Sequence, residues 1–154
     1  DLHYPLRRQR QMCIRDSYTI AMERIELSTR GSTELVDITQ KVQAIVSSKN
    51  VDAGICVIFT KHTTTGIIIN ENEGGLRSDI LTLLDGLVPK GKGYLHDRID
   101  SNAHAHLRAV VLGSSETIPI ENGTLALGTW QSIIFVECDG PRRREVCVQI
   151  IEGR

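Results

Sequence analysis

Three uninterrupted apolar runs set the strongest limit on how this chain can fold. They are Ile55–Phe59, Ile67–Ile69 and Ile133–Val136. Side chains alternate between the two faces of a strand, so a strand that is apolar at every position is typical of one buried on both sides. Only three short segments look helical and could cover these strands. We therefore expect the run Ile133–Val136 to need cover from further copies of the chain.

Shorter patterns predict the other strands. The complete set of expected strands is Met22–Ser28, Ile55–Phe59, Ile67–Ile69, Trp130–Cys138 and Glu145–Ile151. In addition, Thr117–Leu127 predicts a hairpin, because Asn122-Gly123 supplies the two residues that a type I′ turn favours.

Helical spacing of apolar residues predicts three helices. The first begins at Asp37, with Gln40 three positions later as in a capping box. The second runs from about Leu76 to Leu87. The third starts near Asn102 and ends at Gly113, and its apolar stripe is Ala103, Leu107, Val110 and Val111. Three helices among hairpin-linked strands indicate a single α+β domain with mixed or antiparallel sheets.

Length and composition narrow the class of protein. The chain has 154 residues, 40% of them apolar, and a net charge of −1. That length suits one domain, and the charge gives no global attraction to nucleic acid or to an acidic membrane. No apolar run approaches the length of a membrane span, and the start carries no signal-peptide pattern. Cys56, Cys138 and Cys147 lie in apolar runs, which is typical of buried cysteines in the reducing cytoplasm.

The first 21 residues lack these patterns. They contain the stretch RRQRQMCIRDS, which resembles translated sequencing-adapter sequence more than natural protein. We therefore expect residues 1–21 to be a disordered or loosely packed extension and residues 22–154 to form the domain. An RNA-binding arm built on Arg7, Arg8 and Arg10 is the alternative, but no aromatic platform accompanies these charges.

Polar residues cluster where two of the apolar strands end. Lys61–Thr65 follows the first strand and Asn70–Glu73 follows the second. Loops held by a rigid scaffold often carry binding groups, although Asn and Thr also favour turns and caps. His62 has no such turn role, and we interpret it as a candidate site residue.

Four histidines are candidates for a metal site or for acid–base chemistry. His62 and His96, together with either His104 or His106, are candidate ligands of a divalent ion such as zinc. On a helix, His104 and His106 project about 200° apart, so only one of them can join that set. Both would then lie at the edges of the apolar stripe, where replacement by alanine costs little stability. A polar pocket without metal, in which a histidine acts as acid or base, is the alternative.

A last polar stretch surrounds the end of the strand Trp130–Cys138. Period-two spacing places Gln131, Glu137 and Asp139 on one strand face. A carboxylate on an apolar strand needs a partner or has a raised pKa. The arginines 142–144 could bind phosphate through their planar guanidinium groups, or could form a solvated charge run.

Four motifs follow one another along the chain: HTTTGIIINENE, NAHAHLRA, TIPIENGTLALGTWQ and DGPRRR. Together they resemble the YjbQ family, also called UPF0047, and the resemblance spans Met22 to Gly153. It implies an α+β domain, a homotrimer and a polar site near the contacts between subunits. The motif positions implied for that site are His62, Thr63, Thr64, Asn70, Glu71, Asn72, His96, Asn102, His106, Trp130, Gln131, Glu137, Asp139, Gly140 and Arg142. His104 stands at a variable position of its motif, so His106 is expected in the site.

The resemblance also implies an activity, secondary thiamine-phosphate synthesis. This reaction joins a hydroxymethylpyrimidine diphosphate to a thiazole phosphate and releases pyrophosphate, which calls for Mg²⁺ or arginine near the leaving group. On this hypothesis His62, His106, Glu137 and Asp139 are catalytic. The other polar motif residues bind substrate, with Trp130 stacking on the pyrimidine and Arg142 holding phosphate. One alternative is a metal-dependent hydrolase of a small phosphate ester, with His62, His96 and His106 as metal ligands and Glu137 or Asp139 as the base. The other alternative is a non-catalytic trimer that binds a small anion.

Overall fold

The computed structural model describes residues 21–153. Of the predicted extension 1–21, all but Ala21 lies outside the described residues. The strands are β1 (Glu23–Ser28), β2 (Glu34–Asp37), β3 (Gly54–Thr60), β4 (Thr65–Asn70), β5 (Ser115–Glu121), β6 (Thr124–Leu125), β7 (Ser132–Glu137) and β8 (Arg143–Glu152). The helices are α2 (Thr39–Ser48), α3 (Gly74–Leu87), α4 (Ala103–Leu112) and the short 3-10 helix η1 (Leu95–Arg98).

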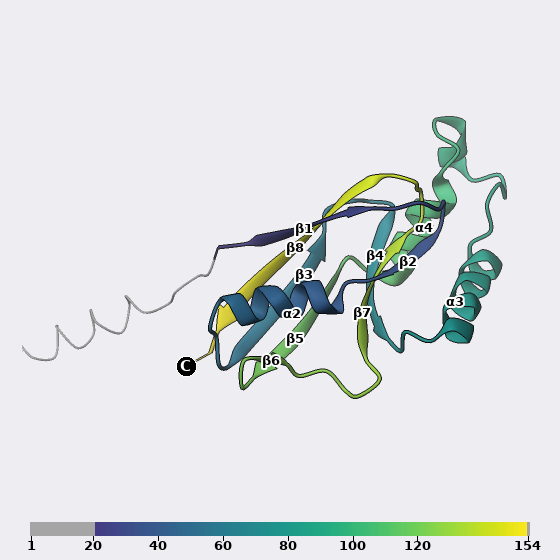
Figure 1. The fold of residues 1–154 in the computed structure, drawn as a ribbon. Coiled ribbons are helices and arrows are strands. Elements are labelled where there is room, and N and C mark those ends of the chain that lie inside the picture. The colour runs from purple at the N-terminus through teal and green to yellow at the C-terminus, as the bar shows by residue number, and fades with distance from the viewer. Residues whose placement is uncertain (1–20, 154) are drawn as a thin grey trace, which may run out of the picture.

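The strands form two antiparallel sheets (Figure 1). The larger has the order β1-β8-β3-β5-β6, and the smaller has the order β2-β7-β4. Every neighbouring pair of strands is antiparallel. The predicted α+β class is confirmed. The short strand β2 is absent from the sequence prediction, which began a helix at its last residue.

Strand β7 is the centre of the smaller sheet and is buried on both faces. Ile133 and Phe135 point into the larger core cluster, whereas Ile134 and Val136 belong to the smaller cluster with Leu84 of α3. The prediction that this strand is buried on both sides is confirmed. The expectation that it needs cover from other copies is wrong, because one chain covers both faces.

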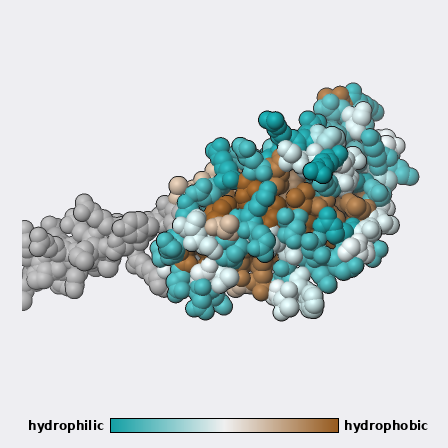
Figure 2. Space-filling view, in the orientation of Figure 1, coloured by the Kyte–Doolittle hydropathy of each residue, from teal (hydrophilic) through white to brown (hydrophobic). Residues whose placement is uncertain are grey.

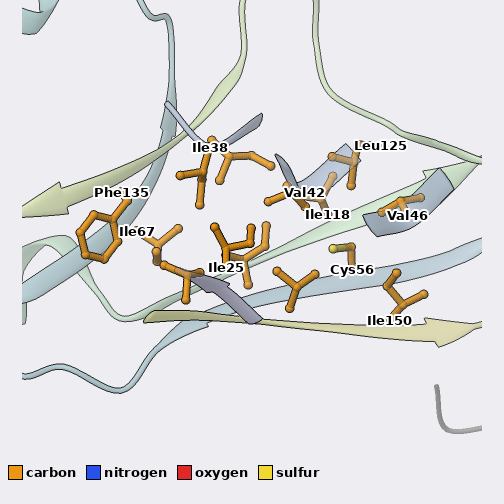
Figure 3. Close-up of a cluster of buried hydrophobic side chains, with 14 of the residues drawn as sticks. Ile25, Ile38, Val42, Val46, Cys56, Ile67, Ile118, Leu125, Phe135 and Ile150 are labelled. Carbon is orange, nitrogen blue, oxygen red and sulfur yellow. The ribbon is translucent and has the colours of Figure 1, made fainter. Parts of the chain in front are cut away.

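Helix α2 lies across one face of the larger sheet (Figure 1). Its Val42 and Val46 pack with Ile38 into the larger core, which Figure 3 shows from close by. The predicted capping box is wrong in detail. Ile38 occupies the N-cap position and makes no side-chain cap bond, while Asp37 accepts hydrogen bonds from both the backbone N–H and the hydroxyl of Thr39.

The ends of the other strands agree in part with the sequence. The predicted type I′ turn is confirmed, since Asn122 and Gly123 have φ of 50° and 72°.

Strand β7 begins only at Ser132, so Gln131 and Asp139 lie outside it. The predicted strand face shared by Gln131, Glu137 and Asp139 is therefore wrong. The amide oxygen of Gln131 instead accepts a hydrogen bond from the backbone N–H of Gly128, at 2.8 Å.

Helix α4 leaves three of the four residues of its predicted apolar stripe exposed and buries Ala103. Leu107, Val110 and Val111 are exposed, and we call these three residues the α4 outer face. His104 and Arg108 point inward instead. Arg108 is accommodated because its guanidinium donates to the carbonyl of Val88 at 3.0 Å, to Asp85 at 2.7 Å and to Thr33 at 3.3 Å.

The surface view shows where apolar side chains reach solvent. In Figure 2 they form a broken band across the middle of the displayed face, bordered by hydrophilic residues. No helix among residues 21–153 is long and apolar enough to cross a membrane. Cys56, Cys138 and Cys147 are free and buried, as predicted, while Cys13 lies outside the described residues.

Candidate functional site

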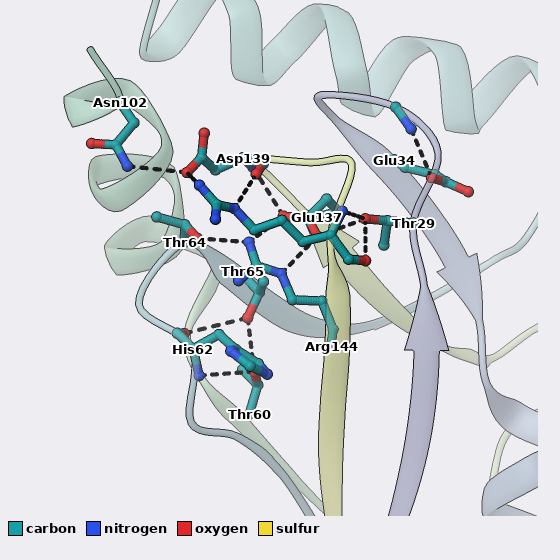
Figure 4. A network of polar contacts seen from close by, with 12 residues as sticks. Thr29, Glu34, Thr60, His62, Thr64, Thr65, Asn102, Glu137, Asp139 and Arg144 are labelled. Atoms are coloured by element: carbon teal, nitrogen blue, oxygen red, sulfur yellow. Dashed lines mark hydrogen bonds and ion pairs between the residues drawn. The ribbon is translucent and has the colours of Figure 1, made fainter. Parts of the chain in front are cut away.

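A buried ion pair between Glu137 and Arg144 forms the centre of a polar cluster (Figure 4). The Arg144 guanidinium donates through Nε and Nη2 to the two carboxylate oxygens, at 2.8 and 2.7 Å. The carboxylate also accepts from the Thr29 hydroxyl at 2.9 Å and from the backbone N–H of Asp139 at 3.0 Å. Burial alone would raise the pKa of Glu137, but these bonds outweigh it and hold the pKa below its ordinary value.

The Glu137 carboxylate thus has four protein donors and no exposed surface. A carboxylate in that state cannot take a proton from a substrate without losing its own bonds. The arrangement favours a positioning role for Glu137, rather than the base predicted from the sequence.

Asp139 continues the cluster towards solvent. It accepts from the Asn102 amide at 3.0 Å and from Arg142 Nη2 at 3.1 Å. Burial acts to raise the pKa of Asp139, but these two bonds and the charge of Arg142 lower it overall. About half of the Arg142 side chain remains exposed. An exposed guanidinium at this place can bind an anion.

The loop after β3 fixes His62 beside Arg144. The hydroxyls of Thr60 and Thr65 lie 2.7 Å apart and are buried. Thr60 accepts from the backbone N–H of His62, and Thr65 donates to its carbonyl, each at 3.3 Å. The Nε2 atom of His62 accepts from the backbone N–H of Glu145 at 3.0 Å. Burial and the charge of Arg144 lower the pKa of His62.

Two cavities meet at His62. One of about 550 Å³ is lined by Glu26, Ser28 and the arginines 143–144. The other, of about 570 Å³, is lined by Phe59, His106 and Val110. The structure thus brings His62 and His106 to one cavity.

The remaining histidines take different places. The rings of His96 and His106 meet edge to face, with centroids 4.8 Å apart. His104 is buried, with 8% of its surface exposed, and its Nδ1 has no hydrogen-bond partner. Burial, Arg108 and Lys90 lower the pKa of His104. The expectation that both His104 and His106 lie on partly exposed helix edges is wrong for His104.

The predicted metal ligands do not converge within one chain. Among residues 21–153, no three His, Cys, Asp or Glu side chains lie close enough together to hold a metal ion. The site at His62, His96 and His106 therefore stays a prediction.

The predicted substrate-binding residues divide between opposite ends of the smaller sheet. Thr63, Thr64, Asn102 and Arg142 lie near Glu137, at the end where β7 finishes. The others lie at the far end, where β4 finishes and β7 begins, roughly 20 Å away at 3.3 Å per residue. They are Asn70, Glu71, Asn72, Trp130 and Gln131.

At that far end, several polar side chains have structural partners. Asn72 donates to Asp37 and accepts from Arg77, and Asn70 accepts from the backbone N–H of Glu71. Trp130 is 73% exposed. One chain therefore does not bring Trp130 to His62 or Glu137.

Sequence reasoning considered Arg144 only as a phosphate ligand or a solvated charge, and it missed the buried pairing of Arg144 with Glu137 and the threonines that hold the cluster. Arg144 alternates in phase with Val146 and Val148, which are buried. That phase was a usable signal, because a charged residue on the buried face of a strand needs a partner. No comparable pattern marks Thr29 or Thr60.

The fold and the cluster define a class of protein. It is a small α+β domain of two antiparallel sheets, with a buried arginine–glutamate pair beside a solvent-facing histidine and arginine. The family described as UPF0047 protein YjbQ-like matches residues 23–153, and the chain belongs to this family.

Individual relatives agree with this assignment. A UPF0047 protein of Archaeoglobus fulgidus is 51% identical over 127 residues, which cover 82% of this chain and 98% of the relative. The protein YugU of Bacillus subtilis is 34% identical over 131 residues, which cover 84% and 98%. The crystal structure of a YbjQ-like protein from Sulfolobus solfataricus has a TM-score of 0.84 at 43% identity, covering 86% of this chain and 97% of that one.

Proposed function

We propose that the cluster around Arg144 binds a small phosphorylated ligand, and that the chain is a thiamine-phosphate synthase. The observation that carries the binding proposal is the exposed guanidinium of Arg142, held by Asp139 beside the buried pair. Arg144 is buried and donates through Nε and Nη2 to Glu137 and Thr64. Arg142, with about half of its side chain exposed, can meet an incoming anion.

The proposed reaction requires the protein mainly to hold the two substrates in place and to neutralise charge on the leaving group. The thiazole nitrogen bonds to the methylene carbon of the pyrimidine, while the carbon–oxygen bond to the diphosphate breaks and pyrophosphate leaves with the bonding electrons. Arg142 would neutralise charge on the leaving group. No general base is required for this step, which fits a Glu137 carboxylate occupied by protein donors.

Turnover and binding are measured separately to test the proposal. Purified protein is given a hydroxymethylpyrimidine diphosphate, a thiazole phosphate and Mg²⁺, and thiamine phosphate is quantified. Pyrophosphate binding is measured by calorimetry. We expect Arg142→Met to weaken pyrophosphate binding about tenfold or more, since a charge-assisted bond is lost, while Lys41→Met on exposed α2 binds as the parent does.

The outcomes separate the candidate functions. Binding without product would support the non-catalytic anion-binding alternative. Equal binding by the parent and the Arg142→Met variant would contradict the proposed site.

We also propose that the chain assembles as a homotrimer, as the family resemblance implies. The supporting observation is the α4 outer face, where Val110 is 79% exposed. Exposed apolar clusters of this kind commonly mark association surfaces. Light scattering is expected to give a trimer for the parent and a smaller species for Val110→Glu. Ala44→Glu, on the exposed side of α2, is the control, and a monomeric parent would refute the proposal.

A further inference from the structure

The two ring nitrogens of His62 have different environments. Nε2 accepts a hydrogen bond from the backbone N–H of Glu145 at 3.0 Å. A backbone N–H can only donate, so Nε2 must keep its lone pair. In the neutral ring the proton then lies on Nδ1.

The end of strand β3 explains why this hydrogen bond is made. In the larger sheet β8 lies between β1 and β3, and the last residue of β3, Thr60, pairs with Val146. The preceding residue of β8, Glu145, still pairs with Glu26 of β1 but has no β3 residue opposite it. A partly buried N–H needs an acceptor, and the His62 ring takes the place of the missing strand residue.

The backbone of His62 is also fixed. Thr60 and Thr65 bind its N–H and its carbonyl, and the two hydroxyls bind each other. Both threonines are buried. The ring is therefore held from two directions, by its backbone and by Nε2.

The Nδ1 atom remains for a ligand. It has no hydrogen-bond partner among residues 21–153, and it is not among the buried polar atoms without a partner. The ring lines both cavities, the polar one beside Arg144 and the more apolar one beside Phe59 and His106. A ligand with a phosphate group and an apolar ring could extend across this junction.

We propose that His62 binds an oxygen atom of the phosphorylated ligand as an Nδ1–H donor, in a tautomer imposed by the backbone N–H of Glu145. This role rests on the proposed function and differs from the base and the metal ligand predicted from the sequence. With Nε2 occupied and Nδ1 protonated, the neutral ring has no lone pair for a proton or a metal ion.

The tautomer is tested first, on the ligand-free protein. Long-range ¹⁵N–¹H spectra of protein labelled at histidine distinguish protonated from unprotonated ring nitrogens, and the signals absent from a His62→Gln sample identify His62. We expect a protonated Nδ1 and an unprotonated Nε2 at neutral pH. A protonated Nε2, or a mixture of both tautomers, would overturn the proposal.

Inorganic pyrophosphate is then added to the same sample. We expect the His62 signals to move while Nδ1 stays protonated. Movement of Arg142 signals without any change at His62 would overturn the donor role alone. If no signal of the site moves, the proposed function fails, whereas the tautomer result stands by itself.

Matched variants test the donor by affinity. His62→Ala removes the donor, and we expect pyrophosphate binding to weaken about tenfold or more. His62→Asn keeps an amide N–H near the position of Nδ1 and is expected to retain most of the affinity. Equal loss in the two variants, with unchanged melting temperatures, would overturn the donor role.

Discussion

Arg144 and Glu137 meet through two parallel hydrogen bonds of 2.8 and 2.7 Å, and both side chains are buried. The two residues belong to different sheets, since Glu137 is the last residue of β7 and Arg144 is the second residue of β8. The pair therefore ties the smaller sheet to the larger one at the end where His62 and Asp139 lie. Removing either charge leaves the other buried and unpaired.

Glu137→Gln is expected to lower the free energy of unfolding by about 3 kcal/mol or more, which is typical of breaking a buried ion pair. Glu145→Gln is the control, because Glu145 is partly exposed and its ion pair is with an exposed residue. The distance from Glu145 Oε1 to Arg24 Nε is 3.6 Å. Glu145→Gln should lower the free energy of unfolding by no more than about 1 kcal/mol. Chemical denaturation measures both values, and similar losses would contradict the central role of the pair.

The same pair predicts how stability depends on pH. The pKa of Glu137 is lower in the folded chain than in the unfolded one. Its contribution is therefore fully present above the unfolded pKa of roughly 4.3 and is lost as the pH falls through the lower folded pKa. Denaturation of the parent between pH 7 and pH 3 should show this loss, and Glu137→Gln should show a shallower decline over that range. Parallel curves would argue against the assignment.

His104 and His106 should separate stability from binding. His104 is buried on the inner side of α4, so His104→Ala is expected to cost about 1–3 kcal/mol of stability. His106 lines the cavity with His62, so His106→Ala should cost less than about 1 kcal/mol and should abolish pyrophosphate binding. Melting curves and calorimetry on the two variants check this. The reverse pattern would place the ligand site at His104.

Two glycines test the close approach of α4 to β4. A Cβ added at Gly66 would lie 2.6 Å from Cβ of Leu112, so Gly66→Ala should destabilise the fold by about 1–3 kcal/mol. Gly86, inside α3, has no atom within 4 Å of such a Cβ. Gly86→Ala should therefore stabilise by about 0.5–1 kcal/mol, through the backbone alone. Equal effects in denaturation would show that the contact between α4 and β4 is not tight.

The sequence by itself determined the local elements, because strand and turn patterns depend on neighbouring residues. The apolar run of β7 predicted a strand buried on both faces, and Asn122-Gly123 predicted the turn between β5 and β6. Motif matching also selected residues that the structure brings together, such as His62 and His106. Sequence patterns do not predict contacts between residues in elements that are distant along the chain.

Only the tertiary structure decided which polar residues are buried and which apolar ones are not. The stripe on α4 indicated an inward face of Leu107, Val110 and Val111, yet Arg108 points inward because Val88 and Asp85 supply its acceptors. His62 and Glu145 are 83 residues apart in the chain. A local sequence pattern cannot predict this contact, because the hydrogen bond forms only when the strands have come together in the sheet.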